Sequence, residues 1–312
     1  MRAHCLAAAL TLLGAWGCGE LEPQVSFPYD PQLSGRLGKD NPAWPSACDR
    51  PPAERVGLPV ALQLEPTQLP VDHALIQDLV RTVEDLRQPF ARLFQRHVCA
   101  VVLMHAAPMT GTLQQLDGSG TRGLILLNVD NLTPPDGDWL ALKESTVFAP
   151  VPGRVLRGTM ARPDEQPRRV LLEFLLVHEL THLLEQIYAD DPLIEAFKDQ
   201  SWPRQDALVN TPLVHYPSRK GRAPLPDELL EPYYDLIASG PFASPAAVSN
   251  GREDFADSVA TFMHTMLRGR PWQLDLYRDG QRVRQLRSCW EEARCAEKRR
   301  LIERLLQQWS QQ

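Results

Sequence analysis

VHELTHLLEQ, residues 177–186, contains the pattern His-Glu-x-x-His at His178, Glu179 and His182. It lies within residues 168–189, where apolar side chains surround almost the whole circumference of a helix, so we expect that helix to run through the core. Residues four apart lie on one face of an α-helix, about 6 Å apart. His178 and His182 could therefore present their imidazoles to a single metal ion, with Glu179 beside the first of them.

Burial favours a metal site over a chance arrangement. Two histidines and a glutamate on an otherwise apolar helix need partners that offset the loss of water. A zinc ion with a bound water supplies such partners, and Glu179 is placed to reach that water. The sequence therefore predicts one Zn²⁺ ion at His178 and His182.

A catalytic zinc site usually has three protein ligands. The sequence Glu253-Asp254-Phe255-Ala256-Asp257, at the start of a second predicted helix, offers the third. Glu253 could bind the metal while Asp257, one turn later, accepts a hydrogen bond from the far nitrogen of a ligand histidine.

Three other residues compete for the position of third ligand. Glu185 shares a helix face with the histidines, but a straight helix carries it ~10 Å from His178. His264 is ~16 Å from Glu253 along its helix, which favours a place in the core or behind a ligand. Asp254 remains an alternative because aspartate also binds zinc.

The two motifs together, His-Glu-x-x-His and Glu-x-x-Ala-Asp, resemble those of the gluzincin metallopeptidases. Glu-Asp-Phe-Ala-Asp is similar to the second zinc motif of the neprilysin-like and of the anthrax-lethal-factor-like enzymes. The resemblance implies that His178, His182 and Glu253 bind zinc, that Glu179 is the general base and that Asp257 supports a ligand. It also implies an α+β, zincin-like fold, with a small twisted sheet, an active-site helix below a cleft and a mostly helical C-terminal part.

The family also implies that an edge strand above the cleft pairs with an extended substrate, and Gly123–Val129 is our candidate for it. Lethal-factor-like enzymes carry a tyrosine shortly before the glutamate motif that stabilises the oxyanion. Here the corresponding stretch reads Ser244-Pro245-Ala246-Ala247. Four residues between the two metal motifs are candidates for the donor, although each also has an ordinary structural explanation: His215, Tyr216, Tyr233 and Tyr234.

The function that these residues predict is zinc-dependent hydrolysis of a peptide bond in a peptide or protein substrate, with Glu179 as general base. The alternative is an exported binding or scaffold protein that zinc stabilises and that has little or no turnover. Zinc-dependent hydrolysis of a non-peptide bond is a third interpretation. A formal net charge of -6 and the lack of a basic stripe with aromatics exclude a general nucleic-acid binder.

Residues 1–18 have the order of an export signal: Arg2, a short apolar run over residues 6–13, and small residues before Cys18. Their context resembles a bacterial lipobox, which implies lipidation of Cys18 and a lipoprotein of the bacterial envelope. Ordinary secretion after cleavage behind Ala15 or Gly17 is the alternative. We expect contact with a membrane only through the lipid.

Four cysteines remain in the exported chain, and an even number in an oxidising compartment predicts two disulfides. We expect Cys289 to pair with Cys295, and Cys48 with Cys99.

The proline-rich residues 19–70 are predicted to form a tether, and residues 71–312 the catalytic domain. Apolar periodicity and turn residues predict the order of the elements within that domain. They are a helix from Asp72 that Pro89 breaks, strands at Val98–His105 and Gly123–Val129, mostly loop at Asp130–Gln166, a helix at Arg252–Leu267, a hairpin at Trp272–Leu286 and a helix ending at Trp309.

Overall fold

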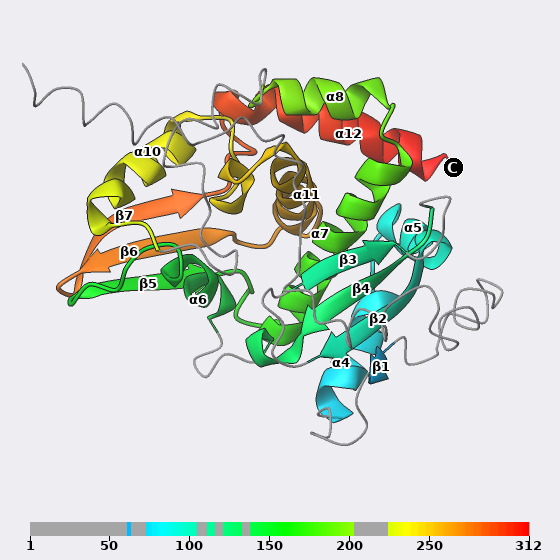
Figure 1. The fold of residues 1–312 in the computed structure, drawn as a ribbon, viewed down its shortest axis with the longest axis horizontal. Helices are drawn as coiled ribbons and strands as arrows, with labels where there is room; N and C mark the ends of the chain where they lie inside the picture. Colours follow the sequence, from blue (N-terminus) through cyan, green and yellow to red (C-terminus); the bar gives the residue numbers. More distant parts are fainter. Residues whose placement is uncertain are drawn as a thin grey trace, which may run out of the picture.

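The computed structural model describes residues 61–63, 73–104, 111–115, 121–132, 138–202 and 224–311. Helices and two small sheets make up this part of the chain, which confirms the α+β class (Figure 1). The four-stranded sheet lies on one side of the long helix α7 (Pro167–Ile187), and the three-stranded sheet lies on the other.

The four-stranded sheet has the order β1-β2-β4-β3. Its strands are β1 (Ala61–Gln63), β2 (Val98–Met104), β3 (Gly111–Gln115) and β4 (Gly123–Asn128). The first three in this order are parallel, and β3 joins β4 in antiparallel register. The two predicted strands are thus confirmed, while β1 lies inside the range assigned to the tether.

The predicted edge strand does not lie at either edge of this sheet, because the edges are β1 and β3. Every residue of β4 is buried and the strand pairs on both sides, whereas β3 occupies the edge. A continuous apolar run such as that of β4 is typical of a strand covered on both faces. The prediction that Gly123–Val129 is the exposed edge was therefore wrong, and β3 was missed.

Two N-terminal helices cover the sheet and contact α7: α4 (His73–Glu84) and α5 (Phe90–His97). The predicted break at Pro89 is confirmed, because α4 ends before it and α5 begins after it. Their buried apolar faces belong to one continuous core with α7, which is buried nearly all round.

The segment 130–166, predicted as mostly loop, contains α6 (Trp139–Ser145) and β5 (Arg154–Thr159). Asp138 caps α6 by accepting a hydrogen bond from the backbone N–H of Ala141, and it also accepts one from Gly158 in β5. The partner of β5 is β6 (Gln273–Arg278), more than 100 residues later, which forms the predicted hairpin with β7 (Gln281–Arg287). Pairing over such a distance leaves no local signal in the sequence.

The second core helix is α11 (Gly251–Phe262), which continues as a π-helical turn over Met263–Leu267. Its start is fixed by Asn250, whose side-chain oxygen accepts hydrogen bonds from the backbone N–H groups of Arg252 and Glu253, each at 3.0 Å. Three further helices complete this part of the chain: α8 (Pro192–Asp199), α10 (Leu230–Ser239) and α12 (Ala296–Ser310). α8 contacts both α11 and α12, while α10 lies beside β7 (Figure 1).

The C-terminal helix is tied to the core in two ways. The predicted disulfide between Cys289 and Cys295 forms just before α12, with the Cα atoms 5.7 Å apart. Nζ of Lys298, on α12, donates to both carboxylate oxygens of Asp254 on α11, at 2.7 and 2.6 Å. Both side chains are almost fully buried, so this is an ion pair inside the core.

Other expectations concern residues outside the described ranges, among them the export segment with Cys18. Cys99 is disulfide-bonded, while its predicted partner Cys48 lies outside those ranges. Within the described part of the chain, no helix combines the length and the apolar content needed to cross a membrane.

Candidate metal centre

The structure brings His178, His182 and Glu253 together. One ligand atom from each lies within 4.8 Å of the other two. Nε2 of His178 is 3.4 Å from Oε2 of Glu253, and Nε2 of His182 is 3.7 Å from Oε1 of the same carboxylate. Packing of α7 against α11 creates this arrangement, with the histidines on one helix and the glutamate in the first turn of the other.

The distances fit a zinc ion. Four-coordinate zinc at ~2.0–2.1 Å from its ligands keeps neighbouring ligand atoms roughly 3.3 Å apart. The two nitrogen–oxygen distances are close to that value. The side chains are 11%, 12% and 25% exposed, respectively, so Glu253 gives the group an opening to solvent. A site with three protein ligands and an open side is the arrangement of catalytic rather than structural zinc.

A carboxylate lies behind each histidine. Nδ1 of His178 is 3.2 Å from Oδ1 of Asp257, which was predicted as its supporting partner. The other oxygen of Asp257 accepts a hydrogen bond from the hydroxyl of Ser244. Such partners fix the orientation of a ligand histidine and direct its other nitrogen toward the metal.

Glu185 has the corresponding place behind His182, with Oε2 3.9 Å from Nδ1 of the imidazole. Lys198 and Arg252 hold its carboxylate, with their Nζ and Nε atoms at 3.0 and 3.4 Å. Sequence analysis weighed Glu185 only as a rival ligand. Its position three residues after His182, on the same face of the helix, is the signal for the role of supporting partner.

The electrostatics of the group favour a cation among these residues. Burial alone would lower the pKa of His178, but the neighbouring carboxylates of Asp257 and Glu253 raise it to about 9. Burial opposes the charge of His182 in the same way, while Glu253 and Glu185 raise its pKa to about 10. Despite its burial, the carboxyl of Glu253 has a pKa well below the usual range because of the two imidazoles. The carboxylates therefore stabilise positive charge at this point, which a metal ion can provide instead of protons.

Glu179 lies beside the ligand group and is buried. Burial raises the pKa of its carboxyl, against the charges of His178 and His182. The backbone of β3 comes very close, because a Cβ atom added at Gly111 would lie 2.7 Å from Oε1 of Glu179. Gly111 was not among the predicted site residues. A glycine inside a strand often marks such a close approach, but β3 itself was not predicted.

A cation that sequence analysis also missed lies near the site. Nζ of Lys143, on α6, is 4.0 Å from Oδ1 of Asp257, and its charge helps to lower the pKa of Asp257. The same charge opposes the rise in the pKa of Glu179 that burial causes. Lys143 lies in the segment that was predicted as loop, so its sequence gave no indication of this position.

The structure describes two of the four candidates for an oxyanion donor. Tyr233 and Tyr234 are buried on α10 and pack against Phe148, with ring centroids 5.4 and 6.0 Å away. The hydroxyl of Tyr233 donates to the carbonyl of Pro245 at 3.0 Å. Both tyrosines thus belong to the core, and the other two candidates, His215 and Tyr216, lie outside the described residues.

The remaining rivals for the third ligand lie elsewhere. Asp254 is fully buried and paired with Lys298. His264 is buried in the core, with Nε2 2.8 Å from the carbonyl oxygen of Pro271, and burial lowers its pKa to about 4. Neither residue belongs to the ligand group around Glu253.

No protein-family model, curated protein or solved structure matches the chain. The interpretation of the site therefore depends on its own geometry and on the two short motifs.

Proposed function

We propose that the protein is a zinc-dependent endopeptidase of the gluzincin type, with a zincin-like arrangement around α7 and α11. The observation that carries the proposal is the convergence of His178, His182 and Glu253 from two helices, with Glu179 beside them. An inert structural zinc site would normally close its fourth position with a further protein ligand and would need no base.

Glu179 would accept a proton from the attacking water and later donate it to the leaving amine. Zinc bound by the three ligands would supply a Lewis acid that polarises the scissile carbonyl and lowers the pKa of water. Burial supports the role of Glu179, because it raises the pKa of the carboxyl and makes it a better proton acceptor. Asp257 and Glu185 would keep the Nε2 atoms of the histidines directed toward Glu253.

The substrate would bind as an extended strand along β3. This strand is the edge of its sheet and passes directly over Glu179 at Gly111. Adding a strand to such an edge provides backbone hydrogen bonds with little side-chain selectivity. The close approach at Gly111 would keep the backbone of β3 next to the general base.

A zinc-stabilised binding or scaffold protein is the alternative. The observation in its favour is that Tyr233 and Tyr234 are buried, and that the hydroxyl of Tyr233 already donates to the carbonyl of Pro245. The presence of Glu179 next to the ligands favours the peptidase.

We also propose that the protein is exported and anchored through lipid on Cys18. The disulfide between Cys289 and Cys295 agrees with an oxidising compartment. Radiolabelled palmitate should attach to the wild type but not to Cys18→Ser. Equal labelling of both proteins, or none of either, would contradict the lipid anchor.

The test of the peptidase is metal content and cleavage of a diverse peptide library, measured on one purified sample with and without chelator. We expect one zinc per chain and cleavage that chelation abolishes. Glu179→Gln should retain zinc but lower turnover by about 10²–10⁴-fold, whereas the exposed Glu291→Gln should behave as the wild type. Stoichiometric zinc without cleavage would favour the binding protein, and full activity of Glu179→Gln would reject the mechanism.

A further inference from the structure

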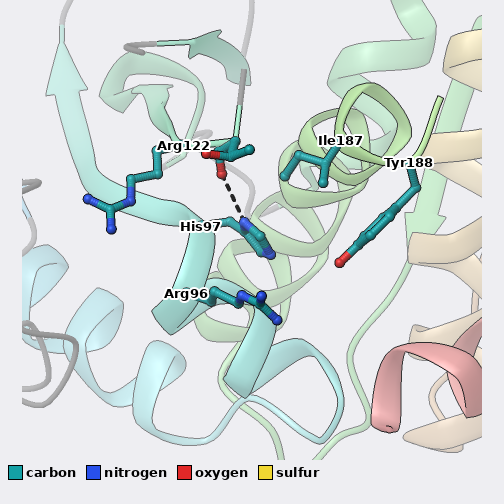
Figure 2. A pocket seen from close by; sticks show the side chains of 6 residues that line it. Arg96, His97, Arg122, Ile187 and Tyr188 are labelled. Atoms are coloured by element: carbon teal, nitrogen blue, oxygen red, sulfur yellow. Dashed lines mark hydrogen bonds between the residues drawn. The ribbon is translucent and has the colours of Figure 1, made fainter. Parts of the chain in front are cut away.

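A pocket at the end of α7 is lined by side chains that already have partners. Its volume is about 580 Å³, and Arg96, His97, Arg122 and Tyr188 lie around it (Figure 2). All four take part in interactions within the chain. Nδ1 of His97, for example, is 2.8 Å from the carbonyl oxygen of Thr121. Exposed arginines in a regular pattern occur instead on the three-stranded sheet.

The outer face of the three-stranded sheet consists of three rows of paired residues. Directly paired residues of neighbouring strands point to the same face of a sheet, so each row crosses β5, β6 and β7. The first row contains Val155, Tyr277 and Arg282, the second Arg157, Asp275 and Gln285, and the third Thr159, Gln273 and Arg287. Alternate residues of the strands point the other way, and among them Leu274, Leu276 and Leu286 are buried in the core. The rows therefore lie on the side of the sheet that faces away from the core.

Each row contains one arginine, and all three arginines are exposed: Arg282, Arg157 and Arg287. Two of them lie on β7 and Arg157 lies on β5, so successive arginines alternate across the sheet. Neighbouring rows are two residues apart along β6, which corresponds to ~6.6–6.8 Å. The arginines therefore repeat at the period of alternate residues in an extended chain.

The acidic residue of the outer face, Asp275, is buried and already hydrogen-bonded. Its two carboxylate oxygens accept from the side-chain amides of Gln273 and Gln285, each at 2.8 Å. Nη1 of Arg282 is 3.7 Å from Oδ1 of Asp275, which is longer than a hydrogen bond. Three positive charges and one negative charge leave the outer face with a net positive charge, whereas the formal net charge of the whole chain is -6. The outer face thus attracts an acidic partner that the chain as a whole repels.

Aromatic and apolar side chains accompany these charges. The guanidinium of Arg157 lies over the ring of Tyr277, 5.1 Å from its centroid, and a stacked guanidinium keeps its N–H donors in its own plane, available to a partner. Val155 and Val283, which is the extra residue of a bulge in β7, are 49% and 50% exposed. Arginine and tyrosine are enriched at protein interfaces. The composition of the outer face therefore fits a protein partner.

We propose that the outer face binds an extended protein segment that carries an acidic residue at every second position. In such a segment alternate side chains point to one side and repeat every ~6.6–6.8 Å, which is the spacing of the rows. Each carboxylate can then accept two hydrogen bonds from one guanidinium. A lipid surface offers no such fixed repeat. The inference goes beyond the proposed peptidase, because the contact requires neither zinc nor Glu179.

The test is the binding of labelled peptides to the full-length protein, measured by fluorescence polarisation. One probe alternates glutamate with serine, a second has glutamine in place of glutamate, and a third has the composition of the first with its glutamates in one block. We expect the alternating acidic probe to bind roughly 10–100-fold more tightly than the glutamine probe, and more tightly than the block probe. Glu179→Gln should bind it as the wild type does.

The variants Arg157→Gln, Arg282→Gln and Arg287→Gln should each weaken binding of the alternating acidic probe by about 2–5-fold. The triple variant should bind the acidic and the glutamine probes equally. Because the three side chains are exposed, we expect all these variants to fold, which circular dichroism and thermal unfolding check.

The matched control removes the same charge from α12: Arg299→Gln, Arg300→Gln and Arg304→Gln in one triple variant. This control should keep the preference for the acidic probe. The docking surface is rejected if the wild type binds the acidic and the glutamine probes equally. It is also rejected if both triple variants lose the preference, because net charge would then explain the binding.

Two further measurements distinguish other occupants of the outer face. Co-sedimentation with vesicles of phosphatidylcholine and phosphatidylglycerol tests an anionic lipid surface, and sedimentation velocity tests a second copy of the chain. Vesicle binding or self-association that the triple variant of the outer face loses, without any preference for the acidic probe, would overturn the proposal.

Discussion

His178 and His264 are two buried histidines near one aromatic ring, and they have opposite properties. The centroid of Phe174 lies 6.5 Å from the ring of His178 and 5.9 Å from that of His264. Burial disfavours the charged form of both imidazoles. Nevertheless the pKa of His178 is raised to about 9, while that of His264 is lowered to about 4.

The difference comes from the groups that face the nitrogen atoms of each imidazole. His178 has a carboxylate near each nitrogen, from Glu253 and Asp257, whereas Nε2 of His264 faces the backbone carbonyl of Pro271. In a low dielectric, two full negative charges outweigh the cost of burial and one carbonyl dipole does not. Both histidines are buried, so burial does not distinguish them. A carboxylate near each ring nitrogen favours a cation at His178, whereas His264 lacks such carboxylates and remains a neutral histidine of the core.

The largest effect on this comparison should come from Glu253→Ala, which removes the carboxylate shared by the two ligand histidines. We expect zinc affinity to fall by more than the ~10–100-fold typical of a supporting partner. His264→Gln should keep one zinc per chain. Competition with a chelator of known affinity measures both, and equal zinc affinity in the two variants would remove the distinction between the histidines.

The next largest effect should come from a buried charge outside the site. Lys298→Met leaves Asp254 without its partner in the core, so we expect a loss of about 3–5 kcal/mol in the free energy of unfolding. Adding Asp254→Asn removes the unpaired charge and should restore part of that stability. Urea unfolding measures both variants. Equal stability of the single and double variants would show that the charge of Asp254 is not the cause.

A smaller effect is expected from Asp257→Asn, which keeps the shape of the side chain but removes the charge behind His178. Zinc affinity should decrease by roughly 10–100-fold, while exposed Asp235→Asn should leave it unchanged. Isothermal titration of zinc into the metal-free proteins measures the difference. If Asp257→Asn binds zinc with the affinity of the wild type, the carboxylate of Glu253 alone is enough to favour a cation at His178.

The remaining effect is the dependence of stability on pH, and its sign differs between the two histidines. The pKa of His264 is about 4 in the folded protein, below the usual 6.5, so only the unfolded chain takes up its proton as the pH falls from 6.5 to 4. Stability should therefore fall with pH in that window, by at most ~1.4 kcal/mol per pH unit from this residue. His264→Gln should have a flatter profile there, and an unchanged slope would contradict the lowered pKa.

In the metal-free protein, the contribution of His178 to stability should decrease as the pH rises, which is opposite to the effect of His264. The raised pKa of His178 contributes stability that is fully present below pH 6.5 and is lost as the pH rises through about 9. Urea unfolding of the chelated wild type and of Asp257→Asn between pH 7 and 10 measures this contribution. The variant should lose less stability over that range.

The sequence predicted those elements whose signal is local. α7 and α11 follow from apolar periodicity and capping residues, and the hairpin β6–β7 follows from Asp279-Gly280 at its turn. β3 and β5 were missed because their partners are set by the three-dimensional arrangement. β3 has a mixed sequence at a sheet edge, and β5 pairs with a strand more than 100 residues away.

The same division holds for the candidate site. The helical spacing of His178 and His182 and that of Glu253 and Asp257 could be read directly, but the choice of Glu253 over Asp254 needed the resemblance. Lys143, Ser244 and Gly111 come from other segments, and no spacing rule links them to the histidines. Their positions result from packing of the whole core around α7.

The bond between Lys298 and Asp254 also affects when the site can form during synthesis. Asp254 is adjacent to the proposed third ligand, Glu253, and its partner Lys298 follows 44 residues later in the chain. A growing chain that has already exposed His178 and His182 still lacks the anchor that holds the start of α11 in the core. Assembly of the candidate metal centre is therefore linked to synthesis of α12, which would keep the proposed peptidase inert until that helix has been made.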